Sequence, residues 1–193
     1  MKNKLEDYVV VIKDAVPTKL CDKAIKELKS VNWTQHKFYN HQTQKHNALS
    51  GEKELEFSDN YITSHDEIMM RVWQSLGQYV EHYKFPWFSG WSGHSTLKYN
   101  KYKKGTLMKE HCDHITDLFE GEKRGIPTLS VIGGLNDNYS GGEFVMFKDK
   151  EIKFKKGELV IFPSNFLYPH EVKIVTKGTR YSLVMWFMGA PFK

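Results

Sequence analysis

The stretch TLSVIGGLNDNYSGGEFVMF, residues 128–147, decides the fold class of this chain. It contains two short apolar runs rich in β-branched and aromatic residues, and between them a segment of Asn, Asp, Ser and Gly with the composition of a turn. Pieces of the same kind, about eight strands in all, follow one another from residue 91 onward, with further turn signals such as KKGE at 155–158. Their length and spacing predict a β-sandwich or jelly roll over the second half of the chain.

The first part of the chain has a helical pattern instead. The segments VPTKLCDKAIKELKS (16–30) and SHDEIMMRVWQSLGQYVEHY (64–83) carry apolar residues at intervals of three and four. Thr18 and Ser64 stand where helix caps are expected, and Ser64 opens a capping-box pattern. Residues 36–59 are polar without a clear period, which predicts a surface loop or an irregular hairpin.

These patterns predict an α+β protein. A chain of 193 residues suits one domain with a substantial core, and no linker-like segment divides it. We therefore expect a single domain over residues 1–193. Within it, residues 1–90 form a mainly helical support, and residues 91–190 form the jelly-roll core.

The composition excludes several classes of protein. The net charge is +5, but the lysines are scattered along the chain, which is typical of a solvated surface and disfavours nucleic acid as a partner. Cys21 and Cys112 are too few for a disulfide framework. The apolar run at 8–12 is too short for a signal peptide or a membrane span. The simplest expectation is a soluble, cytoplasmic protein without a membrane partner.

The pentapeptide HCDHI, 111–115, concentrates residue types that bind metals. It is open to three interpretations: a structural zinc knot, a chance polar turn, or part of a catalytic centre. On a strand, His111 and Asp113 share a face and can converge on one ion, whereas Cys112 points to the other side. This alternation weakens the zinc-knot interpretation, because the best zinc ligand of the set faces away.

His170 is the candidate for a third ligand. It begins an alternating segment, and Glu171 beside it is a rival carboxylate that would face away on a strand. His111, Asp113 and His170 together have the composition of the 2-His-1-carboxylate triad, which leaves three positions on Fe(II) open.

Four motifs in order carry a resemblance to a known family: YKKGTLMKEHCD (102–113), LSVIGGLNDNYSGGEFVMF (129–147), KKGELVIFPS (155–164) and PHEVKIVTKGTRYSLVMWF (169–187). Together they resemble the prolyl 4-hydroxylase-like branch of the 2-oxoglutarate- and Fe(II)-dependent dioxygenases. The resemblance covers roughly the second half of the chain. It implies a double-stranded β-helix (a jelly roll) with supporting N-terminal helices.

The resemblance also implies a set of site residues. His111, Asp113 and His170 would bind Fe(II) as the catalytic metal, and Arg180 would pair with the distal carboxylate of 2-oxoglutarate. Such a carboxylate calls for an arginine, whose planar fork binds it bidentately and stays charged when desolvated.

The remaining implied contacts concern the co-substrate pocket. Tyr102 matches the tyrosine that precedes the HxD motif in the family, and Ser182 lies two residues beyond the arginine on the same strand face. Gly134 stands where some relatives carry a tyrosine. This departure predicts a roomier pocket and more reliance on Tyr102, Thr128 or Ser130.

The implied activity is hydroxylation of a peptidyl proline, or of a similar side chain in a peptide or protein substrate, with 2-oxoglutarate and O₂ as co-substrates. The aromatic stretch FPWFSGW, 85–91, suits a proline-rich peptide, although core or rim packing is the simpler interpretation. Alternatives are hydroxylation of a free amino acid or other small molecule, nucleic-acid demethylation, and a non-catalytic metal-binding jelly roll. The chain lacks the second arginine and asparagine pattern of the demethylases. The need for ascorbate (vitamin C) is left open.

Overall fold

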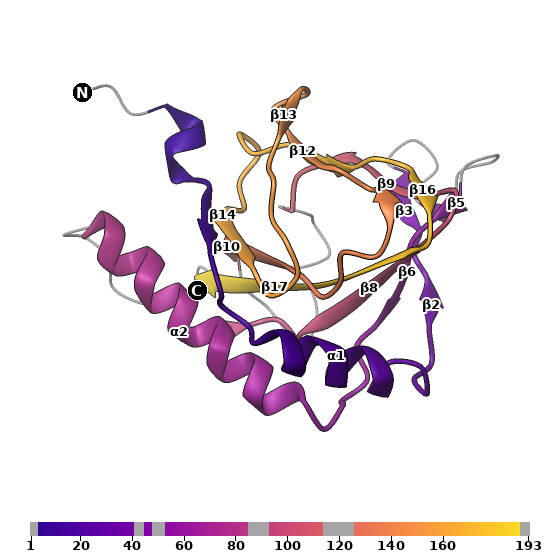
Figure 1. The fold of residues 1–193 in the computed structure, drawn as a ribbon. Helices are drawn as coiled ribbons and strands as arrows, with labels where there is room; N and C mark the ends of the chain where they lie inside the picture. Colours follow the sequence, from indigo (N-terminus) through magenta and orange to yellow (C-terminus); the bar gives the residue numbers. More distant parts are fainter. Residues whose placement is uncertain (1–3, 41–44, 48–52, 85–92, 114–125, 190–193) are drawn as a thin grey trace.

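A computed structural model describes residues 4–40, 45–47, 53–84, 93–113 and 126–189 (Figure 1). The aromatic stretch at 85–91 and nearly all of the segment 114–127 lie outside the described residues, so the expectations placed on them stay predictions.

The two predicted helices are confirmed. α1 spans Thr18–Glu27 and α2 spans His65–Tyr83, and a short 3₁₀ helix, η1, spans Leu5–Tyr8. No helix in the described ranges is long and apolar enough to cross a membrane.

The helix caps differ from those expected. Pro17 occupies the N-cap position of α1, so Thr18 is the first helical residue and caps nothing. Ser64 does occupy the N-cap position of α2, but its side chain makes no capping hydrogen bond. Its backbone N–H instead donates to Glu27 Oε2 at 3.0 Å. The start of α2 is thus hydrogen-bonded to a side chain of α1, and no side-chain cap forms within α2.

Most strands form two sheets. The larger sheet has the order β1-β14-β10-β17-β8-β6-β2, with β7 also paired to β17, and the second has the order β13-β12-β15-β9-β5. The larger sheet contains β1 (Val10–Ile12), β2 (Thr34–Gln35), β6 (Glu56–Ser58), β7 (Gly93–His94), β8 (Lys98–Lys103), β10 (Ile126–Gly134), β14 (Leu159–Pro163) and β17 (Thr179–Gly189). The second contains β5 (Lys53–Glu54), β9 (Thr106–His111), β12 (Phe144–Met146), β13 (Lys150–Glu151) and β15 (His170–Val172).

Two small ribbons complete the described fold. They are β3 (Phe38–Asn40) with β4 (Lys45–Asn47), and β11 (Ser140–Gly141) with β16 (Val175–Lys177). All described pairs are antiparallel except β5 with β9.

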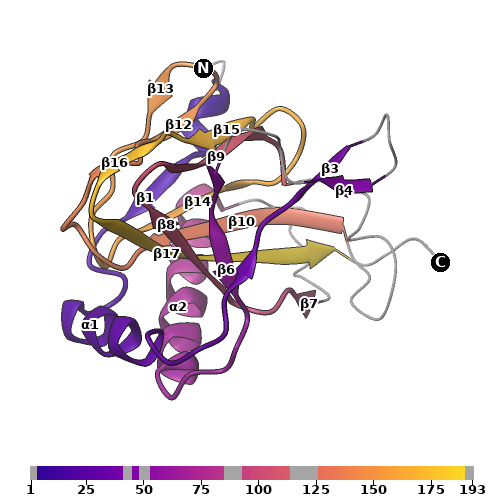
Figure 2. The same cartoon turned by 90° about the vertical axis from the view of Figure 1, so that its right-hand side faces the viewer.

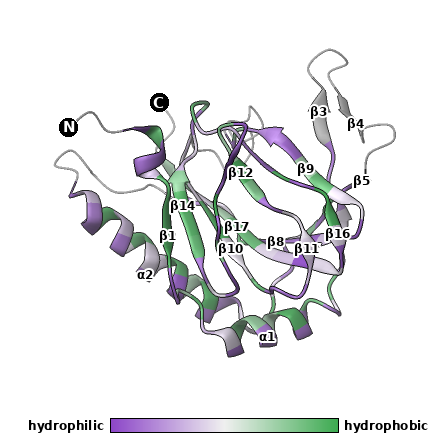
Figure 3. Cartoon of the chain, turned by 45° about the horizontal axis from the view of Figure 1, so that its top comes forward, coloured by the Kyte–Doolittle hydropathy of each residue, from purple (hydrophilic) through white to green (hydrophobic). Residues whose placement is uncertain are grey.

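The sheets face each other, and both helices cover the outer face of the larger one (Figures 1 and 2). One apolar cluster lies between helices and sheet, and includes Leu20, Ile68 and Leu183. A second lies between the two sheets, and includes Phe144 and Phe162. In Figure 3, β1, β12 and β14 have hydrophobic colours, whereas the helices show both colours, as expected for elements with one face in water. This is the predicted jelly roll supported by helices.

The predicted loop at 36–59 contains more structure than expected. The irregular hairpin is present as β3 and β4, but β5 and β6 also extend the two sheets. These strands are two or three residues long, too short for an alternating pattern to be recognised. The first ninety residues therefore contribute strands as well as helices.

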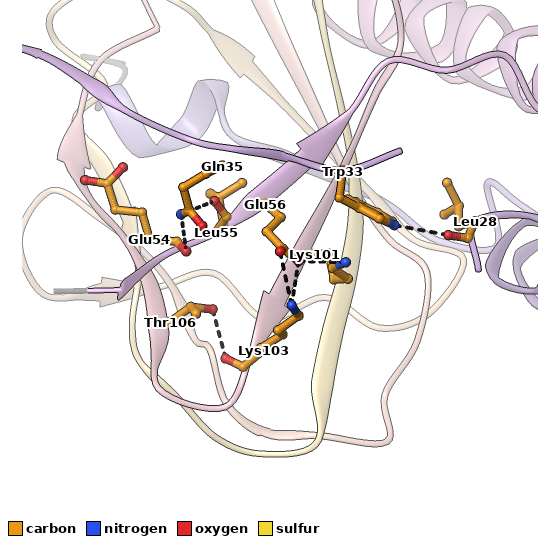
Figure 4. A network of polar contacts seen from close by, with 9 residues as sticks. All are labelled: Leu28, Trp33, Gln35, Glu54, Leu55, Glu56, Lys101, Lys103 and Thr106. Carbon is orange, nitrogen blue, oxygen red and sulfur yellow. Dashed lines mark hydrogen bonds and ion pairs between the residues drawn. The ribbon is translucent and has the colours of Figure 1, made fainter. Parts of the chain in front are cut away.

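Polar side chains stabilise the edge of the larger sheet that is formed by β8, β6 and β2 (Figure 4). Glu56 accepts from Lys101 at 2.6 Å and from Lys103 at 3.0 Å, which ties β6 to β8. Trp33 donates its indole N–H to the carbonyl of Leu28 at 3.2 Å and thereby joins the edge to the end of α1. The edge that carries β2 is thus fixed to the helical layer.

The double glycine of the opening motif is required by the backbone. Gly141 and Gly142 have φ of 73° and 69°, a left-handed conformation that costs little only for glycine. A Cβ on Gly141 would also collide with the backbone carbonyl of Ile174. The turn can therefore bring β11 directly against β16.

Candidate metal centre

Three predicted ligands come together between the two sheets. β9 ends at His111, Asp113 lies two residues beyond, and His170 begins β15, where strand pairing places it opposite His111. One ligand atom from each side chain lies within 4.8 Å of the others. Asp113 Oδ1 is 3.5 Å from His111 Nε2 and 3.7 Å from His170 Nε2. We call these three residues the metal triad.

Backbone carbonyls orient both imidazoles. His111 donates its Nδ1–H to the carbonyl of Lys109 at 2.7 Å, and His170 donates its own to the carbonyl of Tyr168 at 3.1 Å. This leaves Nε2 of each ring as the nitrogen that faces the other ligands, 3.5 and 3.7 Å from Asp113 Oδ1. Such outer hydrogen bonds are the usual means by which proteins fix a metal-binding histidine.

Burial and charge shift the three pKa values in different directions. Burial lowers the pKa of His170 to about 4, so this imidazole is neutral near pH 7. For His111, burial acts to lower the pKa, but the hydrogen bond and charge of Asp113 outweigh it and raise the pKa. For Asp113, burial acts to raise the pKa, but the two histidines and Ser130 hold it below its usual range. The site thus contains a buried carboxylate anion beside two imidazoles, a donor set that fits Fe(II).

Cys112 does not join this set. Its Sγ lies 3.4 Å from the carbonyl of Phe166, and it is not part of the ligand group found among the described residues, which weakens the zinc-knot interpretation. The reason differs in part from the one expected, because the strand ends at His111 and Asp113 lies in a bend. The alternation of side chains persists over these two residues although the strand does not.

The predicted co-substrate residues also lie together. Arg180 on β17 pairs in register with Tyr102 on β8, and its guanidinium carbon lies 4.9 Å from the centre of the Tyr102 ring. Arg180 Nη1 donates to Ser182 Oγ at 3.0 Å. Burial raises the pKa of Tyr102, although the charge of Arg180 opposes the shift, so the phenol keeps its proton.

Arg180 has no anionic partner in the described part of the chain. Its side chain is 2% exposed, and it forms no ion pair with any described acidic residue. A buried cation without a counter-charge is costly. Its guanidinium can therefore pair with a carboxylate from outside the chain.

Thr128 and Ser130, suggested as co-substrate contacts because Gly134 replaces a tyrosine of some relatives, make other hydrogen bonds in the structure. Thr128 donates to the carbonyl of Phe187 at 3.0 Å, and Ser130 donates to Asp113 Oδ2 at 2.6 Å. The space in front of Gly134 is filled rather than open, because a Cβ there would lie 2.7 Å from the carbonyl of Lys155. The roomier pocket expected at this glycine is therefore wrong.

Sequence reasoning missed the groups that surround the triad. The rings of Phe162 and Phe144 lie 5.1 and 5.4 Å from that of His170 and form an apolar wall. Both occupy apolar strand positions, a signal that indicates core packing and nothing more. Ser164, within the KKGELVIFPS motif, had no signal of its own, although it hydrogen-bonds to Ser130.

Comparison with known proteins agrees with this arrangement. A viral collagen prolyl hydroxylase from Paramecium Bursaria Chlorella virus-1 superposes with a TM-score of 0.68 at 14% identity, over 95% of this chain and 97% of that one. A prolyl hydroxylase from Trichoplax adhaerens, solved with a hypoxia inducible factor peptide fragment, gives 0.68 at 14% identity, over 94% and 83%. The fold is thus the double-stranded β-helix of the prolyl hydroxylases.

Sequence comparison gives a family match over the second half of the chain. Residues 97–188 match the family model described as the 2OG-Fe(II) oxygenase superfamily. A PKHD-type hydroxylase of Aliarcobacter butzleri is 34% identical over 94 residues, which cover 46% of this chain and 41% of that protein. The chain therefore matches only about two fifths of this curated relative's length.

Proposed function

We propose that this protein is a 2-oxoglutarate- and Fe(II)-dependent dioxygenase that hydroxylates a proline within a peptide or protein. The metal triad would hold Fe(II), and Arg180, with Tyr102 and Ser182 beside it, would bind the distal carboxylate of 2-oxoglutarate. The family match and the names of its relatives, which are hydroxylases and prolyl hydroxylases, support the proposal.

One observation carries the proposal: a buried arginine without a described counter-charge lies in the same barrel as the metal triad. The triad alone would also suit a metal-binding protein without activity. The arginine adds a place for a dicarboxylate, and Fe(II) with a 2-oxo acid is a combination that activates O₂.

The overall reaction balances as follows. 2-Oxoglutarate is oxidatively decarboxylated to succinate and CO₂ and takes up one oxygen atom, while the other enters a C–H bond of the substrate as hydroxyl. The chain's own contribution is geometric and electrostatic. Asp113 supplies a fixed negative charge, the two imidazoles would bind the metal through Nε2, and Phe144 with Phe162 limits access of water on one side.

The peptide substrate rests on analogy with the relatives. The Trichoplax enzyme was solved with a peptide, and the viral enzyme is named for collagen. Proline-rich segments favour an extended conformation that is already ordered and docks at low entropic cost. Hydroxylation of a free amino acid is the alternative.

The test is a substrate screen. The purified protein is incubated with Fe(II), 2-oxoglutarate, air and proline-rich peptides, with and without ascorbate, and both succinate and peptide mass are measured. We expect a mass gain of one oxygen atom on proline, and none on matched peptides with alanine at that position. Faster turnover of free proline or methylated DNA than of every peptide would exclude the peptide substrate. Absence of succinate under all conditions would exclude the oxygenase.

Domain organisation and location belong to the same proposal. We propose that residues 1–193 form one domain, with residues 91–190 as its catalytic core. The core nevertheless recruits β5 and β6 from the N-terminal part. A cytoplasmic location is supported by Cys21 and Cys112, which are both free thiols, as is usual in a reducing compartment.

A further inference from the structure

The two oxygen atoms of Asp113 have different surroundings. Oδ1 faces the Nε2 atoms of both histidines, at 3.5 and 3.7 Å. Oδ2 points the other way and accepts a hydrogen bond of 2.6 Å from Ser130 Oγ. The carboxylate is 5% exposed, so this contact lies away from solvent. One oxygen is thus held by the protein, and the other is presented to the metal position.

Ser130 is itself held by a second hydroxyl. Its Oγ lies 2.8 Å from Ser164 Oγ, and the two serines are 0% and 1% exposed. A hydroxyl has one proton to donate. Since Ser130 donates its proton to Asp113, Ser164 must donate to Ser130. The three groups therefore form a directed chain from Ser164 through Ser130 to the carboxylate.

Rigid elements carry this chain. Ser130 lies in β10, between β14 and β17 in the centre of the larger sheet, and Ser164 follows directly after β14. The backbone N–H of Ser164 donates to the carbonyl of Thr128 at 3.1 Å, which fixes the position of its hydroxyl. Asp113, in contrast, lies beyond the end of β9, in a bend. The larger sheet thus holds Asp113 through Ser130, although Asp113 itself lies outside any strand.

We propose that Ser130 is a positioning residue that holds Asp113 by Oδ2, so that Oδ1 alone binds the metal, with Ser164 setting the direction of the Ser130 proton. This inference rests on the proposed function, because it takes Asp113 to be a metal ligand. It extends that function by explaining how the chain keeps coordination positions open.

The physical reason is competition for Oδ2. A free carboxylate can bind a metal through both oxygens, which would use a position that the co-substrate or O₂ needs. A short O–H···O⁻ bond is charge-assisted and about twice as strong as a neutral one. In this buried place it restrains rotation of the carboxylate and draws Oδ2 away from the metal. Removing such an outer partner typically weakens metal binding by about 10- to 100-fold.

The experiment uses Co(II), whose visible absorption depends on the number and arrangement of its ligands. Metal-free wild-type protein, Ser130→Ala and Ser164→Ala are titrated with Co(II), and affinity and spectrum are recorded. We expect about 10- to 100-fold weaker binding in Ser130→Ala, with a spectrum altered toward higher coordination. Ser164→Ala should change both in the same direction but less. Ser75→Ala is the matched control, because Ser75 is a buried serine whose hydroxyl bonds within α2, to the carbonyl of Arg71.

The possible outcomes distinguish failure of the Ser130 positioning role from failure of the proposed metal site. Wild-type protein that binds Co(II) no better than His111→Ala would overturn the metal site itself. Wild-type binding together with wild-type affinity and spectrum in Ser130→Ala would overturn the positioning role alone. If Ser130→Ala does not fold, Ser164→Ala decides: an unchanged spectrum refutes the proposal, and a partial shift supports it.

Discussion

Replacement of Arg180 tests the co-substrate site most directly. The guanidinium is 2% exposed, lies 4.9 Å from the ring of Tyr102 and 5.8 Å from that of Phe154, and donates to Ser182. No described acidic side chain competes for it. A carboxylate that reaches this place therefore meets a desolvated cation that has no described counter-charge.

The expected magnitude follows from that burial. Truncating one partner of a buried, hydrogen-bonded charge pair costs about 2 to 5 kcal/mol. At about 1.4 kcal/mol for each factor of ten, the affinity for 2-oxoglutarate in Arg180→Ala should fall by about 30- to 4,000-fold. Arg180→Lys keeps the charge but loses the planar fork, so its loss should be smaller than that of the alanine variant.

The assay is calorimetric titration of Co(II)-loaded protein with 2-oxoglutarate, beside the KM for 2-oxoglutarate. Co(II) affinity itself should stay close to wild type, because Arg180 does not contact the triad. Arg71→Lys, on α2, is the matched control and should change neither quantity. An Arg180→Ala variant with wild-type 2-oxoglutarate affinity would remove this residue from the site and, with it, the main support for the proposed co-substrate.

Three further predictions concern the triad and the backbone. Alanine in place of any residue of the metal triad should abolish Co(II) binding, whereas Cys112→Ala should retain it; equal losses would restore the zinc-knot interpretation. Burial lowers the pKa of His170 to about 4, so between about pH 6.5 and 4 only the unfolded chain binds that proton. The free energy of unfolding of the metal-free protein should therefore fall as the pH drops through this window, by up to about 3 kcal/mol, and urea unfolding of His170→Gln should lack this part of the slope. Gly141→Ala, with its positive φ and backbone collision, should destabilise by about 2 kcal/mol or more in urea unfolding; Gly77→Ala, which meets open space in α2, should not, and equal effects would contradict the turn argument.

Strong local patterns made much of the fold predictable. The helices at 18–27 and 65–83 show apolar residues on one face, and the strands near 129–134 and 159–163 are apolar runs bounded by turns. Such signals persist because each element buries that face against a neighbour. The triad was predictable for a different reason, since the order of motifs indicates it although its residues are far apart in sequence.

Features that depend on tertiary contacts were not predictable. β5 and β6 are too short to have a period, and their pairing is decided by partners remote in the chain. The resemblance suggests Ser130 for the co-substrate pocket, but in the structure its hydroxyl donates to Asp113. A buried serine looks the same in sequence whether it supports a metal ligand or fills a core. The assignment depends on a 2.6 Å contact between β10 and the residues that follow β9.

The burial of Arg180 also bears on whether the site is a working one. Replacing a buried charged group by an apolar residue of similar size is often neutral or stabilising. Arg180 lies near the rings of Tyr102 and Phe154, where an apolar side chain would pack without the desolvation penalty. In a jelly roll that only stored or sensed a metal, this arginine would lower the folding stability without contributing to metal binding. A dicarboxylate that enters the barrel would supply the missing counter-charge. The destabilisation is then confined to the protein without its co-substrate, and 2-oxoglutarate should raise the melting temperature of wild-type protein more than that of Arg180→Met.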